Sequence, residues 1–254
     1  MRAHGLRTGL YTSPHLISVR ERIRLGGILI SESDFTSAFF FCWRRLRQTV
    51  LEGPAVPAPT YFKFLTVLAF DVFIRSNVQV AIVEVGIGGR YDATNFIDVP
   101  MVCGISSLGF DHLAILGRTL PEIAYQKAGI IKPRVPVVSV LQEAEAMAVI
   151  ESCARACGSN LWITDTWDNA PSDLKAARLG LEGEHQKANA MLALQLCRTW
   201  LREKFDLQLA KKGLELCRWP GRAQVVPWKQ DLTYYFDGAH TPESIQVSFR
   251  TVIA

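Results

Sequence analysis

Long hydrophobic runs are absent from this chain of 254 residues, although apolar residues make up 49% of it. No uninterrupted apolar stretch approaches the ~20 residues that a helix needs to cross a bilayer. We therefore expect a soluble protein without a membrane span. The high apolar content and the 20% of charged residues exclude a disordered chain, and the length suits one large domain or one domain plus a fraction.

A strong charge of one sign is also missing. The 28 Lys and Arg residues and the 24 Asp and Glu residues give a formal net charge of +4, which is spread along the chain. This bias is too weak to predict a nucleic-acid partner, but it is compatible with small anionic substrates. The tight basic cluster Arg44, Arg45 and Arg47 follows an apolar stretch and is typical of the solvated end of an amphipathic helix.

Cysteine pairs with metal-binding spacing are lacking as well. The six cysteines include no Cys-x-x-Cys, which argues against a zinc site or a disulfide framework and favours a reducing compartment. Cys153 and Cys157 are four residues apart in a helical pattern, but no third ligand is near them, so we interpret them as small buried hydrophobes. No Gly-x-Ser-x-Gly elbow or Cys–His pairing indicates a hydrolytic enzyme.

Strand and helix patterns alternate along the sequence. The strand patterns cover 8–12, 79–85, 101–106, 135–140 and 160–164, and the helical patterns cover 33–51, 60–76, 120–128, 144–157 and 186–204. A hairpin is predicted over 22–30, with its turn at Gly26-Gly27. The alternation predicts an α/β fold with a mostly parallel, doubly wound sheet.

From about Gly221 onward the pattern changes. A second hairpin is predicted over 223–227 and 232–236, and Thr241 with Pro242 marks the start of a helix. These elements are too few to form an independent core. We therefore predict one domain over residues 1–220 and the beginning of a second α/β domain over 221–254.

Ionisable residues follow the predicted strands in succession. Glu84 opens the glycine-rich turn 85–89, Asp111 and His112 follow the next strand, and Lys127 comes after them. Ligands of open α/β sheets bind outside the carboxyl ends of the strands. The order carboxylate, imidazole, lysine therefore predicts a site for a divalent metal and phosphate. For Arg90 and Asp92, which lie just after this turn, the alternative to a role in the site is simply to close the turn.

The predicted helix that carries Lys127 has clear ends. Thr119 and Glu122 have the spacing of a capping box, and Pro121 suits the first turn. Gly129 is predicted to end the helix in a left-handed conformation. The helix dipole favours a cation in the last turn, so Lys127 taken by itself is interpreted as a solvated lysine at a helix end.

Nine segments resemble the folylpolyglutamate synthase family, whose members are ATP-dependent ligases of the Mur ligase superfamily. They are Leu10-Tyr-Thr-Ser-Pro-His-Leu16, Val19-Arg-Glu-Arg-Ile23, Val83-Glu-Val-Gly-Ile-Gly-Gly89, Asp92-x-Thr-Asn95, Ser107-Leu-Gly-Phe-Asp-His112, Gln126-Lys-Ala-Gly-Ile130, Gly183-Glu-His-Gln-x-x-Asn189, Trp219-Pro-Gly-Arg222 and Asp237-Gly-Ala-His240. Together they cover nearly the whole chain in the family's order, which makes the resemblance highly specific. It implies a Mur ligase-like central ATPase domain, and the Ser-Pro-His-Leu form favours the folate branch.

The resemblance implies ATP and Mg²⁺ as cofactors, with a monovalent cation as a further option. Ser13, Glu84 and His112 would be metal ligands. A hydroxyl and a carboxylate suit a hard cation, whereas the histidine is assigned to a second metal position. Lys127 would be the catalytic lysine, carbamylated by addition of carbon dioxide to its neutral amine, which requires that the amine be desolvated.

The nucleotide contacts are implied in the same way. Asn189 would contact adenine, and Arg222, whose fork suits phosphate oxygens, would contact the phosphates. Asp237 and His240 would contact the ribose or the edge of the base.

The substrate pocket would be bordered by His15 and the loop after it. Tyr61, Phe62 and Phe64 are further aromatic candidates for its wall. On spacing alone, the alternative for these aromatics is the apolar stripe of a core helix.

The implied reaction attaches L-glutamate to the γ-carboxylate of folate or tetrahydrofolate through an acyl phosphate. Positioning and charge cancellation would carry the catalysis, without a protein nucleophile. Dihydrofolate synthase is an alternative, because the same scaffold adds the first glutamate to dihydropteroate. We expect a monomeric full-length form in the cytoplasm or in mitochondria.

Relative to the family, we expect this chain to begin after the phosphate loop Gly-Thr-x-Gly-Lys-Gly-Ser and after any leader. We also expect it to stop within the C-terminal domain. Two hypotheses therefore stay open: a ligase, or a catalytically inactive fragment or pseudoenzyme that keeps only metal and folate binding.

Overall fold

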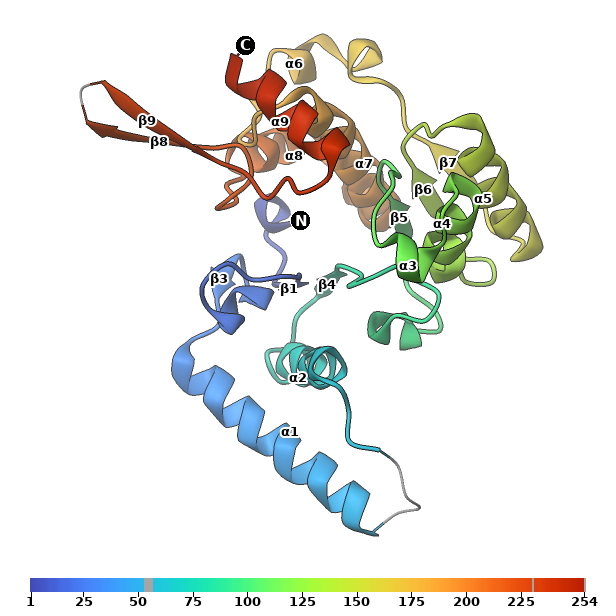
Figure 1. Ribbon diagram of the computed structural model, residues 1–254, viewed down its shortest axis with the longest axis vertical. Helices are drawn as coiled ribbons and strands as arrows, with labels where there is room; N and C mark the ends of the chain where they lie inside the picture. The colour runs from blue at the N-terminus through green and yellow to red at the C-terminus, as the bar shows by residue number, and fades with distance from the viewer. Residues whose placement is uncertain (53–56, 230, 254) are drawn as a thin grey trace. The chain divides into compact units, whose positions relative to one another are not determined.

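The computed structural model describes residues 1–52, 57–229 and 231–253 (Figure 1). The chain divides into two compact units, Met1–Ile97 and Asp98–Ala254. The predicted boundary between residues 220 and 221 stays a prediction. None of the helices in the described ranges is long and apolar enough to cross a membrane.

The first unit contains a four-stranded mixed sheet in the order β3-β2-β1-β4. Its strands are β1 (Thr8–Tyr11), β2 (Ile23–Leu25), β3 (Ile28–Leu29) and β4 (Val80–Val83). β1 pairs antiparallel with β2 and parallel with β4. The predicted hairpin is confirmed, and its turn residues Gly26 and Gly27 adopt positive φ angles of 58° and 85°, which glycine tolerates.

Two long helices form the core of the first unit together with this sheet. They are α1 (Glu32–Glu52) and α2 (Tyr61–Arg75), and the short helices are η1 (Arg2–His4), η2 (Val19–Arg22) and η3 (Ala93–Phe96). α2 packs on β1, and α1 packs on α2 (Figure 1). The core contains Tyr11 and Ile23 from the sheet and Leu68, which is 0% exposed, from α2. Ser31 caps α1, because its Oγ accepts the Asp34 N–H at 3.0 Å.

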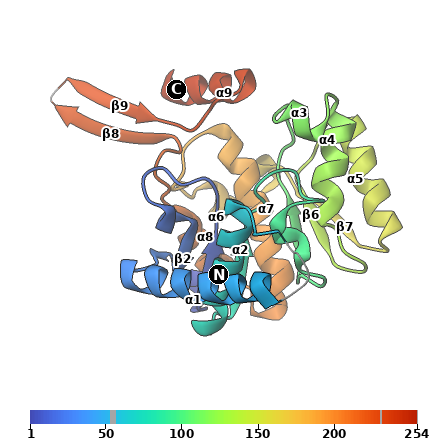
Figure 2. The same cartoon turned by 60° about the horizontal axis from the view of Figure 1, so that its bottom comes forward.

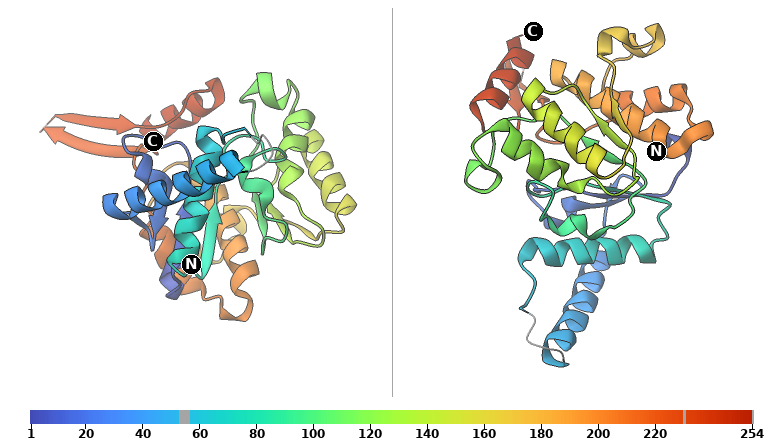
Figure 3. Two further views of the ribbon diagram at one scale, coloured as in Figure 1. Left: turned by 90° about the horizontal axis from the view of Figure 1, so that it is seen from below. Right: turned by 90° about the vertical axis from the view of Figure 1, so that its right-hand side faces the viewer.

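The second unit contains a three-stranded parallel sheet in the order β5-β6-β7. Its strands are β5 (Cys103–Ile105), β6 (Val137–Ser139) and β7 (Leu161–Ile163). α3 (Leu113–Leu116), α4 (Leu120–Lys127) and η4 (Ala128–Ile130) connect β5 to β6, and α5 (Ala144–Ala156) connects β6 to β7. Successive residues of β6 face opposite ways: Val137 packs with Ile150 of α5, whereas Val138 packs with Leu192 of α7 (Glu184–Leu201). Helices therefore cover both faces of this sheet (Figure 3).

The remaining elements of the second unit are η5 (Trp167–Asn169), α6 (Ser172–Lys175), η6 (Arg202–Lys204), α8 (Leu207–Glu215), β8 (Gln224–Lys229), β9 (Leu232–Phe236) and α9 (Pro242–Ile253). β8 and β9 form the predicted antiparallel hairpin, a long two-stranded ribbon in Figure 2. Thr241 caps α9 as predicted, since its Oγ1 accepts the Ser244 N–H at 3.2 Å. Cys153 and Cys157 pack against the core between α5 and the sheet, which supports their interpretation as small hydrophobes.

The α/β class is confirmed, but two details differ from the sequence predictions. The described strands form one mixed and one parallel sheet, because β1 pairs on one side with an antiparallel hairpin strand. The left-handed stop at Gly129 is also wrong. After Lys127 the chain continues in a right-handed turn at Ala128 (φ −65°, ψ −10°) and enters η4, so Gly129 lies within a helical turn.

Candidate functional site

Ser13 and Glu84 lie side by side at the carboxyl ends of neighbouring parallel strands. Tyr11 of β1 is in register with Val83 of β4, and the Glu84 N–H donates to the Tyr11 carbonyl at 2.9 Å. The Ser13 N–H then donates to Glu84 Oε2 at 2.8 Å. Parallel pairing therefore brings together two of the residues that the sequence assigned to a metal site.

The chemistry of this pair suits a hard divalent cation. The Glu84 side chain is exposed and that of Ser13 is partly exposed, so a carboxylate and a hydroxyl are accessible from solvent at one sheet end. Oxygen ligands of this kind are those that Mg²⁺ prefers. The main-chain amide of Ser13 orients the carboxylate, which is the kind of support that metal ligands receive in proteins.

Asp92 closes the glycine-rich turn that follows Glu84. Its Oδ2 accepts the N–H groups of Gly86 and Ile87, both at 3.1 Å. Its Oδ1 accepts the N–H of Thr94 at 2.9 Å and the hydroxyl of Thr94 at 2.6 Å. These four hydrogen bonds support the interpretation of Asp92 as a turn-closing residue.

Arg22, which sequence reasoning did not single out, organises the predicted substrate side of the first unit. It is only 8% exposed, and its Nε donates to His15 Nδ1 at 2.9 Å. Its guanidinium lies 5.7 Å from the centroid of the Tyr61 ring. A cation, an imidazole and an exposed aromatic ring therefore form one cluster, which suits an aromatic acid. The signal for Arg22 was present in Val19-Arg-Glu-Arg-Ile23, directly before β2.

Phe62 and Phe64 take part in packing. Phe64 is buried in the core of the first unit, and the Phe62 ring lies 5.9 Å from the Tyr11 ring. A Cβ at Gly86 would lie 2.6 Å from Phe62 Cζ, so this ring also supports the turn after Glu84. The structure thus favours the core-stripe alternative for these two aromatics.

Lys127 lies partly buried in the last turn of α4 in the second unit. The predicted capping box at the start of this helix is confirmed: Thr119 Oγ1 accepts the Glu122 N–H, and Glu122 Oε2 accepts the Thr119 N–H. Burial lowers the pKa of Lys127, whereas the charge of Asp111 acts in the opposite direction. Lys127 is therefore not a fully solvated lysine, and its desolvation favours the neutral amine that carbamylation requires.

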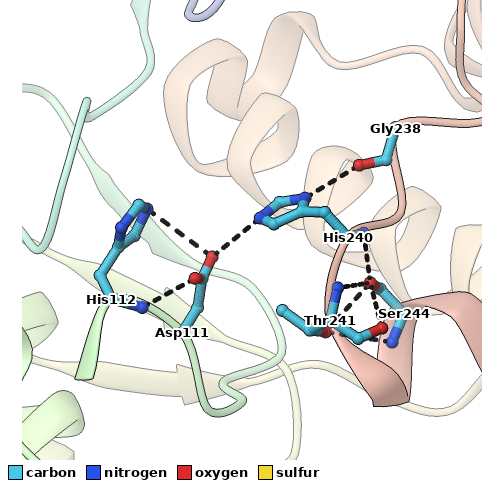
Figure 4. A network of polar contacts seen from close by, with 6 residues as sticks. All are labelled: Asp111, His112, Gly238, His240, Thr241 and Ser244. Carbon is cyan, nitrogen blue, oxygen red and sulfur yellow. Dashed lines mark hydrogen bonds and ion pairs between the residues drawn. The ribbon is translucent and has the colours of Figure 1, made fainter.

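Asp111 joins two of the predicted site histidines (Figure 4). Its Oδ2 lies 3.4 Å from His240 Nε2 and 3.7 Å from His112 Nε2, and its Oδ1 accepts the His112 N–H at 2.7 Å. His240 Nδ1 lies 2.9 Å from the Gly238 carbonyl oxygen. The Gly238 carbonyl, followed by Asp111, raises the pKa of His240. Both ring nitrogens of His240 face acceptors, which suits the imidazolium form.

Asp237 and Arg222 form a second group in the same unit. Asp237 Oδ2 accepts the Ala223 N–H at 2.7 Å, and its Oδ1 accepts the Ala239 N–H at 2.8 Å. Burial raises the pKa of Asp237, but these hydrogen bonds and the Arg222 charge outweigh it, so the pKa is lowered. Asp237 is thus an ionised acceptor beside a guanidinium.

His185 is a further candidate that sequence reasoning did not assign. Burial lowers its pKa, while Asp237 and Arg222 exert opposite electrostatic effects on it. Its Nε2 lies 3.1 Å from Gln186 Nε2, and Gln186 Oε1 accepts the Asn189 Nδ2 amide at 3.1 Å. The predicted adenine contact Asn189 is therefore linked to His185 through one side chain. The segment Gly183-Glu-His-Gln carried the signal.

Arg222 also lines a cleft of about 670 Å³, a volume in the range of small-molecule sites. Trp219 and Arg178 line the same cleft. Arg218 Nη1 donates to the Glu215 and Cys217 carbonyls at 2.8 and 2.7 Å, so this third arginine of the cleft fixes the end of α8.

The sequence of this chain is similar to those of known proteins. No family model matches the chain. It is 46% identical over 265 residues to folylpolyglutamate synthase of Arabidopsis thaliana, covering 97% of this chain and 46% of that protein. It is 43% identical over 275 residues to the mitochondrial folylpolyglutamate synthase of Homo sapiens, covering 98% and 46%. The chain is a folylpolyglutamate synthase homologue.

The fold of this homologue is similar to that of the solved FPGS–AMPPCP–folate complex. The TM-score is 0.86 at 29% identity, and the match covers 99% of this chain and 65% of that one. The homologue spans about half the length of the curated relatives that it matches.

Proposed function

We propose that this folylpolyglutamate synthase homologue acts in ATP-dependent amide formation, which joins L-glutamate to the γ-carboxylate of folate or tetrahydrofolate. The observation that supports this most is the pairing of Ser13 and Glu84 at the carboxyl ends of β1 and β4, where α/β sheets bind ligands. The curated relatives and the folate-containing complex indicate the substrate class.

Ser13 and Glu84 would hold Mg²⁺, and His112 would belong to a second metal position. Bound Mg²⁺ supplies charge neutralisation for the triphosphate and for an acyl phosphate. The Ser13 amide keeps the Glu84 carboxylate in place for this role. The proposal includes a Mur ligase-like domain over residues 1–220 and the beginning of a second domain over 221–254.

The remaining site residues divide into a nucleotide side and a folate side. Asn189, Arg222, Asp237 and His240 would bind ATP, with His185 supporting the adenine end. On the folate side, His15 and Tyr61 would contact the substrate, and the buried Arg22 holds both. Phe62 would support this pocket from the core side.

The chain's own contribution to the reaction would be positioning. The γ-carboxylate of the folate would attack the γ-phosphate of ATP, which releases ADP and gives an acyl phosphate. The amine of glutamate would then attack the acyl carbon, forming the amide bond and releasing phosphate. Donors around Arg222 would bind the nucleotide phosphates, and the cluster around Arg22 would bind the folate, so that cationic groups offset the charge of each anionic reactant. No side chain has to act as a nucleophile.

The assay that tests this function uses purified protein that carries this sequence. We expect γ-glutamylated tetrahydrofolate and phosphate, detected by mass spectrometry, only when ATP, Mg²⁺, tetrahydrofolate and glutamate are all present. Product from dihydropteroate and not from tetrahydrofolate would instead indicate a dihydrofolate synthase. Binding of folate or AMPPCP without product under any combination would contradict the ligase and support the non-catalytic hypothesis.

Carbamylation of Lys127 gives a separate prediction. With ¹³C-labelled bicarbonate, we expect a carbamate carbon signal in the NMR spectrum that strengthens as the pH rises, because carbon dioxide adds to the neutral amine. Burial lowers the pKa of Lys127, so the signal should persist to lower pH than for an exposed lysine. Lys127→Arg should abolish it, while Lys204→Arg, at an exposed lysine, should not. A signal that survives Lys127→Arg would contradict the assignment.

A further inference from the structure

A single carboxylate holds the loop between β1 and η2, residues 12–18. Glu21 Oε2 accepts the N–H of Leu16 at 2.8 Å, and its Oε1 accepts the N–H groups of Ile17 at 3.0 Å and Ser18 at 2.7 Å. Three consecutive main-chain amides therefore point at one side chain. Charge-assisted hydrogen bonds of this kind are roughly twice as strong as neutral ones.

Capping of η2 accounts for only part of this arrangement. The bond from Ser18 belongs to a capping box, in which Glu21 is the partner residue. The bonds from Leu16 and Ile17 extend beyond the box and fix the backbone upstream of it. Glu21 thus sets the shape of a loop segment that lies outside the helix it caps.

The Glu21 carboxylate is ionised at neutral pH and accepts these three hydrogen bonds. The amides of Ser18 and Leu16 are the main causes that lower the pKa of Glu21 from 4.5 to about 2. A lowered carboxyl pKa contributes stability above the unfolded value, and that contribution is lost as the pH falls through about 2. The Glu21 carboxylate therefore stays ionised, and able to accept all three N–H groups, at neutral pH.

The residues that this loop carries belong to the candidate site. His15 lies within it and is held by Arg22, the residue that follows Glu21. Ser13 lies near the start of the loop, and its amide orients Glu84. Glu21 thus fixes the main chain of the loop, and Arg22 fixes its imidazole, His15. The loop joins the proposed metal ligand Ser13 to the proposed folate side.

We propose that Glu21 is a positioning residue for the folate substrate: it fixes the 12–18 loop in the shape that presents His15. This inference rests on the proposed function, which assigns the loop to the folate side. Glu21 acts through the loop amides, and no contact between Glu21 and the substrate is part of the proposal.

The test compares Glu21→Gln with the wild-type protein. Glutamine removes the charge and turns one acceptor oxygen into an NH₂ group that faces the loop N–H donors. We expect the KM for the folate substrate to rise about 10-fold or more, as for the loss of a supporting residue around a site. The KM for ATP should stay within about twofold of the wild-type value, and Glu21→Asp, which keeps the charge, should recover part of the loss.

Asp206→Asn is the matched control. Asp206 also accepts two main-chain N–H groups, those of Gln208 at 2.7 Å and Leu209 at 3.0 Å, but it caps α8 in the second unit. This variant should lose stability without a selective rise in the folate KM. If Glu21→Gln raises the KM values for folate and ATP alike, or leaves both unchanged, the positioning role is overturned.

Two measurements separate this inference from the proposed function. Hydrogen exchange of the Leu16, Ile17 and Ser18 amides should accelerate in Glu21→Gln, whether or not the protein forms product. If wild-type protein forms no product, the function fails, and equilibrium binding of folate then replaces the KM. An unchanged folate Kd in Glu21→Gln would overturn the positioning role in that case.

Discussion

Replacing Glu84 with glutamine is expected to lower kcat/KM for glutamylation at least about 100-fold. A neutral amide is a far poorer ligand for Mg²⁺ than a carboxylate, and even losses in the surroundings of a metal site cost 10–100-fold. Glutamine keeps an oxygen that can accept the Ser13 N–H, so the fold of the first unit should persist. Steady-state kinetics over a range of Mg²⁺ concentrations should show a higher Mg²⁺ requirement.

Glu32→Gln provides the control for this experiment. Glu32 is an exposed carboxylate in the first turn of α1, in the same unit as Glu84 but outside the candidate site. Its loss should leave the Mg²⁺ dependence unchanged. Wild-type Mg²⁺ dependence in Glu84→Gln would show that this carboxylate is not a metal ligand.

Truncation of Leu68 to alanine is expected to lower the free energy of unfolding by about 2–5 kcal/mol. Leu68 is 0% exposed in α2 and belongs to the core that also contains Tyr11, the last residue of β1 before the site. The lost stability has two parts: the transfer free energy of the removed methyl groups, and the cost of a cavity that the neighbouring side chains fill only in part. Denaturant titration followed by circular dichroism measures it.

The neighbouring residue supplies the comparison. Val67, the preceding residue of α2, is 45% exposed, so Val67→Ala should change the free energy of unfolding by no more than about 0.5 kcal/mol. Equal destabilisation by the two substitutions would contradict the packing of α2 described for the first unit.

Local signals in the sequence predicted the elements well. The starts of α4 and α9 followed from Thr119 and Thr241, because a cap depends on hydrogen bonds between residues at most four positions apart. The turn at Gly26 and Gly27 was also predictable locally, because glycine tolerates the positive φ angles that the turn needs. Asp206 caps α8 in the same way, since its Oδ1 accepts the Gln208 and Leu209 N–H groups, but α8 was not among the predicted helices.

Long-range features could not be read from the sequence. The periodicity of a strand does not show which strands it pairs with in the sheet, and the antiparallel pairing of β1 with β2 is therefore not contained in it. The burial that lowers the Lys127 pKa arises from packing around α4. The sequence does not contain that packing, and it therefore indicated a solvated lysine at a helix end. The contact of Asp111 with His240 joins residues far apart in the chain.

The candidate site was only partly predictable for the same reason. Ser13 was assigned to the metal only through the family resemblance, and the parallel register of β1 and β4 brings it beside Glu84. Arg22 and His185 lay within recognised segments, yet only the burial of Arg22 and the side-chain partners of the two residues distinguish them from ordinary polar residues. The bond from Ser18 to Glu21 has the Ser-x-x-Glu pattern of a capping box, but the bonds from Leu16 and Ile17 depend on loop conformation, for which no sequence pattern exists.

The hydrogen bond from Ser13 to Glu84 comes from the main chain, and this separates two contributions of position 13. Alanine or glycine there would remove the hydroxyl but keep the N–H that anchors the carboxylate. Only proline, which has no N–H, would release the anchor as well. Comparing Ser13→Ala with Ser13→Pro therefore separates the loss of the hydroxyl ligand from the loss of the hydrogen bond that orients the Glu84 carboxylate.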